Sequence, residues 1–337
     1  MSSAFIGFFL GRISIIGILR LEWRMFLSHV GSLPIYEGLG EHPYSHIDHW
    51  LKIQTQLGFD LVGTGEPGGH NRYRMIERFT QDIRGFEVRR LGNEYKTYRS
   101  GKIAPPEDAD EVKEVVENRY LRKIAGKEIK LKATVTDPVT IVCGLGNFID
   151  TYRDYPNVFW DLTDALKPFV EALEKIVDII QFDCPIHSYN PTREPWQYVD
   201  ELTKHVKVSK WIHICGPLKN VFPNLASKNA YKVDVVHCHL FGREEEENFK
   251  AIEENAPEFR RSGKKLGAGV INTAISDIAS QVDSTEKVTS RIERLQEILG
   301  KDNIAAMGPG CGLALLPQTA PIILERAAEV SKAIEIK

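Results

Sequence analysis

The stretch "KWIHICGPL" (residues 210–218) is a short apolar run that ends in a histidine, a cysteine and a glycine. A run of this length, bounded by turn residues, is typical of a strand buried on both faces of a parallel sheet. Comparable runs recur from Met25 onward, and longer segments with helical periodicity separate them. This alternation predicts a parallel sheet with crossover helices.

Eight such runs are candidate strands. They are FLSHV (26–30), FDLVG (59–63), IKLKATV (129–135), DIIQF (178–182), KWIHI (210–214), VDVVHCH (233–239), LGAGVI (266–271) and NIAAMG (303–308). Helical candidates include 160–177, 195–205, 244–255, 285–299 and 318–333. In a chain of 337 residues, this pattern predicts an α/β fold, a (β/α)8 TIM barrel, whose typical size is about 250 residues.

One segment, 85–105, departs from the pattern, because alternating residues flank "GNE" as they do in a β-hairpin. We expect a hairpin excursion after strand two. No repeat or low-complexity linker interrupts residues 25–337, which favours a single barrel domain over that range.

The first 24 residues hold an apolar run of signal-peptide length, but Arg12 interrupts it and no small-residue cleavage site follows. The preferred interpretation of residues 1–24 is an N-terminal extension or a misassigned start, with Met25 before the first strand. An ordinary N-terminal helix packed on the body is the alternative.

Composition narrows the class of protein. The chain is 42% hydrophobic and 26% charged, with a formal net charge of -3. This balance offers no basic surface for nucleic acid and predicts neither a nucleic-acid nor a membrane partner. The five cysteines are odd in number and widely spread, which indicates free thiols or metal ligands in a reducing compartment, the cytoplasm.

Two strand ends predict a metal site. His213 and Cys215 are two residues apart, so on a strand both side chains leave the same face. Cys311 lies between glycines at the end of the eighth run. Active sites of barrels gather at these ends, and two thiolates with one imidazole suit a catalytic zinc with an open position. The alternative is a buried structural pair.

Strand six offers a fourth candidate ligand. His237 and His239 share one face and Cys238 lies on the other. Parity admits either histidine, and His239 is favoured because it is nearer the active end; it could instead form hydrogen bonds at the barrel mouth. Cys143 and Cys184 are predicted to be core thiols.

The motifs HVGSLP (29–34), GEPGGHNRYRMIERF (65–79), TDPVTIV (136–142), IIQFDCP (179–185), HICG (213–216) and GPGCGL (308–313) occur in that order. Together they resemble the catalytic barrel of cobalamin-independent methionine synthase. HICG and PGCGL are also similar to methylcobalamin:coenzyme M methyltransferases, in the superfamily that includes uroporphyrinogen decarboxylase. Both methyltransferase families imply a zinc ion that activates a thiol.

The resemblance implies a substrate and its binding residues. Glu66 and Asp183 would clasp the amino group of homocysteine, and Gly31 and Ser32 would hold its carboxylate. The expected activity is zinc-dependent transfer of a methyl group to the homocysteine thiol, which gives methionine. Taken alone, Glu66 is equally a capping partner in a glycine-rich loop, and Asp183 a turn residue before Pro185.

Three departures leave the methyl donor open. The family pattern has a glutamate as a zinc ligand on strand six, where this chain has VDVVHCHL and no glutamate. The family's DCGLKTR motif corresponds to GCGLALL (310–316) in this chain. A second, N-terminal barrel for polyglutamylated folate is also not expected in a chain of this length. The candidate donors are methylcobalamin, free or on a corrinoid protein, and a methylated reduced pterin, with a separate donor-binding protein as a further candidate partner.

Other classes of function remain as alternatives. The acceptor could be coenzyme M or another small thiol. A uroporphyrinogen decarboxylase-like enzyme would need arginines near the first strand end, where HVGSLP supplies none. A noncatalytic zinc-binding barrel would fill all four metal positions with protein ligands.

Overall fold

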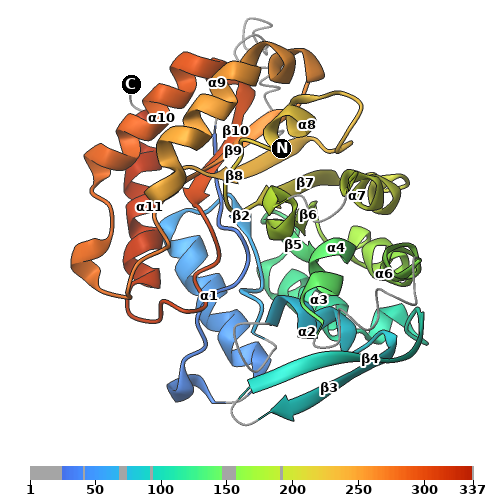
Figure 1. Cartoon of the computed structure of the whole chain (residues 1–337). Coiled ribbons are helices and arrows are strands. Elements are labelled where there is room, and N and C mark those ends of the chain that lie inside the picture. The colour runs from blue at the N-terminus through green and yellow to red at the C-terminus, as the bar shows by residue number, and fades with distance from the viewer. Residues whose placement is uncertain are drawn as a thin grey trace, which may run out of the picture.

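The computed structural model describes residues 25–40, 42–67, 74–91, 94–145, 157–189 and 193–335. Eight parallel strands follow one another in the order β1-β10-β9-β8-β7-β6-β5-β2 (Figure 1). They are β1 (Phe26–Leu27), β2 (Leu61–Val62), β5 (Lys130–Thr136), β6 (Ile179–Asp183), β7 (Ser209–Ile214), β8 (Val235–His239), β9 (Lys265–Ile271) and β10 (Ile304–Pro309). Each predicted strand is present, although β1 and β2 are shorter than expected.

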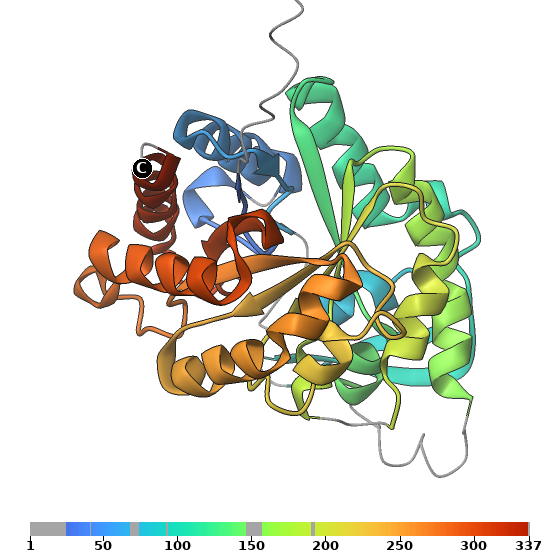
Figure 2. The same ribbon diagram turned by 90° about the horizontal axis from the view of Figure 1, so that it is seen from above.

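The two edge strands of this sheet meet. The backbone N–H of Asp60, just before β2, donates to the carbonyl of Leu27 in β1 at 3.1 Å. The Leu27 N–H donates in return to Asp60 Oδ2 at 2.8 Å. The sheet is therefore a nearly closed barrel, and the predicted (β/α)8 fold is confirmed. Seen from above, the helices lie around the outside of the strands (Figure 2).

Helices connect the strands of the barrel, and some of them begin at a side-chain cap. Ser284 accepts a hydrogen bond from the Lys287 N–H and starts α10, as a helix N-cap does. The α-helices are α1 (Pro43–Leu57), α2 (Arg74–Thr80), α3 (Lys113–Ala125), α4 (Pro138–Cys143), α6 (Val158–Glu174), α7 (Trp196–Thr203), α8 (Phe222–Ala226), α9 (Glu245–Ser262), α10 (Thr285–Leu299) and α11 (Ala320–Glu335). Short 3-10 turns such as η5 (Gly242–Glu244) fill the loops.

The predicted hairpin after strand two is also confirmed. Strands β3 (Arg84–Leu91) and β4 (Glu94–Ala104) pair antiparallel and form a separate sheet. Figure 1 shows this hairpin below the barrel, and it packs against α2 and α6. It leaves the barrel on the side of the second strand and does not interrupt the parallel sheet.

The strands bury different residues on their two faces. Outward residues such as Ile212 and Ile214 join the large core between sheet and helices. A smaller apolar layer packs separately: Leu61, Ile179, Trp211, Val235 and Ala306. Two residues further along their strands, the same face carries polar side chains, among them Gln181, His213 and His237. The barrel interior is therefore apolar toward the N-terminal ends of the strands and polar toward their carboxyl ends.

No helix in the described ranges is long and apolar enough to span a bilayer. Residues 1–24, predicted to be an extension, lie outside the described residues, as do residues 68–73 of the glycine-rich motif. The single-domain assignment of residues 25–337 stays a prediction.

Candidate metal centre and active site

The ends of β7 and β10 bring three predicted metal ligands together. One donor atom each from His213, Cys215 and Cys311 lies within 4.8 Å of the others. The two cysteine Sγ atoms are 3.3 Å apart. Tetrahedral zinc with Zn–S distances of about 2.3 Å separates two sulfurs by roughly 3.8 Å, so a shift of about half an ångström would let the pair bind that ion.

His213 presents one free nitrogen to this cluster. Its Nδ1 lies 2.9 Å from Nδ1 of His237, the residue opposite it on β8. Its Nε2 is buried and has no hydrogen-bond partner among the described residues. A buried nitrogen without a partner is costly, and a bound cation would satisfy it.

The pKa values of the two thiols are shifted in opposite directions. The hydrogen bond from Cys215 lowers the pKa of Cys311 well below its usual value, and His213 adds to this effect. The same bond raises the pKa of Cys215 well above its usual value. A divalent metal bound at this pair would favour the thiolate form of both sulfurs.

The predicted fourth ligand does not join the three. His239 accepts a hydrogen bond at Nδ1 from the Gly216 N–H at 2.6 Å. Its Nε2 lies 3.9 Å from Glu244 Oε2. His237 bonds His213 through its Nδ1. Neither strand-six histidine has a ring nitrogen in the cluster of mutually close donor atoms, and the choice between them stays a prediction.

The loops after β1, β2 and β10 converge beside the cluster. The Leu33 N–H donates to Gly65 O at 2.9 Å, and the Leu313 N–H donates to Ser32 O at 2.7 Å. A Cβ on Gly31 would overlap the Glu66 carboxylate, and a Cβ on Gly312 would overlap the Ser32 hydroxyl. The predicted carboxylate-binding pair, Gly31 and Ser32, thus lies against Glu66 on one side and the Cys311 loop on the other.

Glu66 is buried and already paired. Its Oε2 lies 2.9 Å from Arg78 Nη1, and its Oε1 accepts a hydrogen bond from the Thr134 hydroxyl. Arg78 also contacts Glu114, so one guanidinium serves two buried carboxylates. Glu66 has a φ of 54°, a left-handed conformation that costs a non-glycine residue about 1–3 kcal/mol and is concentrated at functional sites.

Asp183 occupies the end of β6, next to His213 on β7. Burial raises its pKa to about 7, while the His213 imidazole opposes that shift. The Gln181 amide donates to Asp183 Oδ1 at 2.7 Å. Asp183 therefore lies beside the metal cluster with one oxygen held by Gln181.

Residues 30–332 match the family model described as "Cobalamin-independent synthase, Catalytic domain". The chain belongs to this family. The match covers the barrel from the end of β1 to the last helix, and it includes every predicted site residue. Membership confirms the predicted family and the prediction that the chain is an enzyme, a methyltransferase, and argues against the noncatalytic and decarboxylase alternatives.

Similar proteins carry related names. A "Methionine synthase" of Methanocaldococcus jannaschii is 26% identical over 313 residues, which cover 88% of this chain and 90% of that protein. One from Methanothermobacter thermautotrophicus is 24% identical and covers 81% of this chain and 84% of that protein. A "5-methyltetrahydropteroyltriglutamate--homocysteine methyltransferase" of Catharanthus roseus is 26% identical over 78% of this chain and 34% of its own length.

Solved structures share the fold. A B12-independent methionine synthase from a Shewanella species, in complex with selenomethionine, superposes with a TM-score of 0.74 at 19% identity and covers 93% of this chain and 98% of that one. A methyltransferase from Methanosarcina mazei superposes with a TM-score of 0.63 at 13% identity and covers 93% and 94%.

The family corrects one expectation. It is defined as cobalamin-independent, which is at odds with the methylcobalamin or corrinoid donor that the sequence motifs left open. The similarity of HICG and PGCGL to corrinoid-dependent enzymes therefore does not determine the donor.

Sequence reasoning missed several residues of this synthase site. Arg78 reaches Glu66 from helix α2, and no motif spacing marks that contact. Lys132 and Gln181 did carry a signal, since both are polar residues inside runs expected to be fully apolar. Side chains alternate between the two faces of a strand, and this alternation places Lys132 on β5 and Gln181 on β6 in the barrel interior.

A second cluster in this synthase domain has metal-like composition but full hydrogen bonding. Asp137, Cys184 and His187 lie together, all buried. His187 Nε2 bonds Asp137 Oδ1 at 2.9 Å and its Nδ1 bonds the Tyr231 hydroxyl at 2.8 Å. Asp137 also caps α4, and burial raises the pKa of Cys184 well above its usual value. The cluster therefore ties loops together and has no free donor for a metal.

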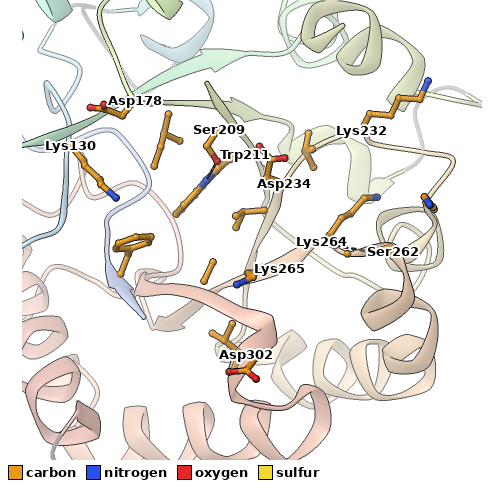
Figure 3. Close-up of a pocket in the computed structure, with 18 residues that line it drawn as sticks. Lys130, Asp178, Ser209, Trp211, Lys232, Asp234, Ser262, Lys264, Lys265 and Asp302 are labelled. Carbon is orange, nitrogen blue, oxygen red and sulfur yellow. Dashed lines mark hydrogen bonds between the residues drawn. The ribbon is translucent and has the colours of Figure 1, made fainter. Parts of the chain in front are cut away.

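A cavity of about 1110 Å³ lies at the opposite end of the barrel from this chemistry. It is lined by residues at the N-terminal ends of the strands, including Lys130, Trp211 and Lys265 (Figure 3). Since the catalytic residues of barrels lie at the carboxyl ends, we do not assign the reaction to this cavity.

Proposed function

We propose that this chain is a zinc-dependent methionine synthase that transfers a methyl group from a methylated reduced pterin to the thiol of homocysteine. The observation that carries the proposal is the cluster of His213, Cys215 and Cys311 at the carboxyl ends of the strands. Family membership and the names of the relatives support it.

His213, Cys215 and Cys311 would hold Zn²⁺ and leave its fourth position for the substrate sulfur. His239 lies outside the group of donor atoms that are within 4.8 Å of one another, so we propose three protein ligands. When bound, the ion supplies Lewis acidity, which keeps the substrate thiol deprotonated at neutral pH, where a free thiol of pKa about 8.5 is mostly protonated.

The remaining residues would bind and orient homocysteine. Asp183 and Glu66 supply negative charge for its ammonium group, and the Gly31–Ser32 backbone and hydroxyl supply donors for its carboxylate. Held in this way, the sulfur attacks the methyl carbon in line at about 3–3.5 Å. The S–CH₃ bond forms as the N–CH₃ bond breaks, and the donor nitrogen leaves with the electron pair and takes up a proton.

The family and the cysteines support our proposals for the donor and the compartment. A methylated pterin is consistent with a cobalamin-independent family and with the name of the Catharanthus relative. All five cysteines are free, which is consistent with the reducing cytoplasm. A separate protein that binds the donor stays a prediction.

The proposal is tested on purified protein by zinc analysis and by an assay of methionine formation from homocysteine and 5-methyltetrahydropteroyltriglutamate. We expect one zinc per chain and methionine formation that a chelator abolishes and added zinc restores. Protein without zinc would overturn the metal assignment. Zinc-loaded protein that forms no methionine would overturn the assignment of substrate or donor.

The Asp183→Asn variant tests the substrate residues. It removes a charge from the ammonium site but keeps the shape, so KM for homocysteine should rise about 10- to 100-fold, the range expected when a charged hydrogen bond is lost. Steady-state kinetics and zinc content are the measurements. Asp302→Asn, an exposed aspartate at the opposite cavity, is the control and should leave KM unchanged. Equal KM values for the Asp183 variant and the parent would remove Asp183 from the site.

A further inference from the structure

Lys132 is a cation inside the barrel. Only 2% of it is exposed, and lysines are rarely buried to this extent unless they are paired. Its Nζ donates to Ser28 Oγ at 3.0 Å and to Gln181 Oε1 at 2.9 Å, and it also contacts the His29 carbonyl oxygen. Three acceptors match the three donors of an ammonium group, so the position of Nζ is fixed.

Lys132 determines which way the Gln181 amide faces. An ammonium can only donate, so the amide oxygen must face Lys132 and the amide nitrogen must face away. That nitrogen donates to Asp183 Oδ1 at 2.7 Å and to Val30 O at 2.9 Å. If the lysine were lost, the amide oxygen would lose its donor, and the Gln181 side chain would be held only by the two hydrogen bonds of its nitrogen.

The Lys132–Gln181 pair therefore contacts both halves of the proposed amino-acid site. Ser28, His29 and Val30 lead directly into Gly31 and Ser32, which would hold the substrate carboxylate, and Asp183 would hold the ammonium. We propose that Lys132, acting through Gln181, is a positioning residue that sets the distance and orientation between the carboxylate side and the ammonium side of the homocysteine site. This inference rests on the proposed function.

Electrostatics agree with the geometry. Burial lowers the pKa of Lys132 to about 7, while the Asp183 and Glu66 carboxylates raise it. The two acids that would receive the substrate ammonium are therefore the groups that favour the charged form of Lys132. The Lys132 side-chain nitrogen also lies 5.4 Å from the centre of the Trp211 ring, where a cation–π interaction stabilises its charged form.

The competing explanation is that Lys132 only fills the barrel. A second buried lysine provides the comparison. Lys264 lines the opposite cavity (Figure 3), and its Nζ donates to the carbonyls of Leu225, Ser227 and Ala230 at 2.6–2.9 Å. Lys264 is also buried and also donates to three oxygen atoms, but it lies at the other end of the barrel from the proposed homocysteine site. Lys264→Met is therefore a matched control.

The experiment compares two thiols in the zinc-loaded Lys132→Met, Gln181→Met and Lys264→Met variants. Homocysteine carries both groups that the site would recognise, and 1-propanethiol has the same thiol chain without them. We expect Lys132→Met and Gln181→Met to raise KM for homocysteine about 10-fold or more while retaining zinc and kcat/KM for propanethiol. Lys264→Met should keep the parental KM for homocysteine.

The outcomes separate the two proposals. Equal losses with both thiols, or an unchanged KM for homocysteine, would overturn the positioning role while the parent enzyme still made methionine. A parent enzyme that made no methionine would overturn the proposed function and this inference together. If Lys132→Met does not fold, Gln181→Met carries the test, because it removes the donor to Asp183 without emptying the barrel.

Discussion

The Cys311→Ser variant is expected to lose its zinc and more than about 100-fold of its methyl transfer activity while staying folded. Serine is a poor ligand at neutral pH, and second-shell changes alone typically cost 10- to 100-fold, so loss of a direct ligand should exceed that range. The fold should survive because Cys311 lies in a loop after β10 and is not part of the large core. Zinc analysis, circular dichroism and the methionine assay measure the three quantities.

Cys143→Ser is the matched control for this prediction. Cys143 is a half-buried free thiol at the end of α4, away from the cluster, and its pKa is raised to about 11 by burial. The control should keep its zinc and activity. A Cys311→Ser protein that kept one zinc and parental turnover would exclude Cys311 as a ligand, and one that unfolded would indicate a structural metal.

The second large effect is expected at Arg78, where Arg78→Met should lower the free energy of unfolding by about 3–5 kcal/mol, the usual cost of removing one partner from a buried ion pair. The Arg78 side chain is 3% exposed and contacts Glu66 and Glu114, whose side chains are 6% and 1% exposed. Without the guanidinium both carboxylates would stay buried beside each other. Urea denaturation followed by circular dichroism measures the change.

The same substitution at an exposed ion pair provides the comparison. Arg294 pairs with Glu246 at 2.8 Å, but the two side chains are 37% and 79% exposed. Arg294→Met should therefore cost less than about 1 kcal/mol. Similar losses of stability for the two variants would mean that burial does not govern the Arg78 cluster.

The architecture was predictable because each strand is a short apolar run with clear boundaries. The strands that were predicted too long are β1 and β2, where the expected runs 26–30 and 59–63 pair only over Phe26–Leu27 and Leu61–Val62. Beyond these positions the chain turns into the loops that carry Gly31 and Glu66, and the runs continue as buried loop segments. A hydrophobic pattern indicates that a segment is buried, but it does not distinguish a strand from a buried loop.

The three proposed metal ligands could be identified from the sequence for a different reason. Strand parity places His213 and Cys215 on one face, and the register of the barrel brings Cys311 to the same end. Strand parity also allowed His239 as a ligand. It could not predict the hydrogen bond that a ring nitrogen of His239 accepts from the Gly216 N–H, because Gly216 lies in a neighbouring loop. Arg78 was not predictable, because a long side chain reaching back from a helix leaves no periodic signal.

The apolar layer of Leu61, Ile179, Trp211, Val235 and Ala306 also has an electrical consequence. Trp211 lines the cavity at the N-terminal ends of the strands and lies against the Lys132 side-chain nitrogen. Low-polarity side chains screen charge far less than water does, so the layer strengthens the interaction of a charged Lys132 with the Asp183 and Glu66 carboxylates. If homocysteine binds as we propose, residues that never touch it would in this way contribute to its recognition.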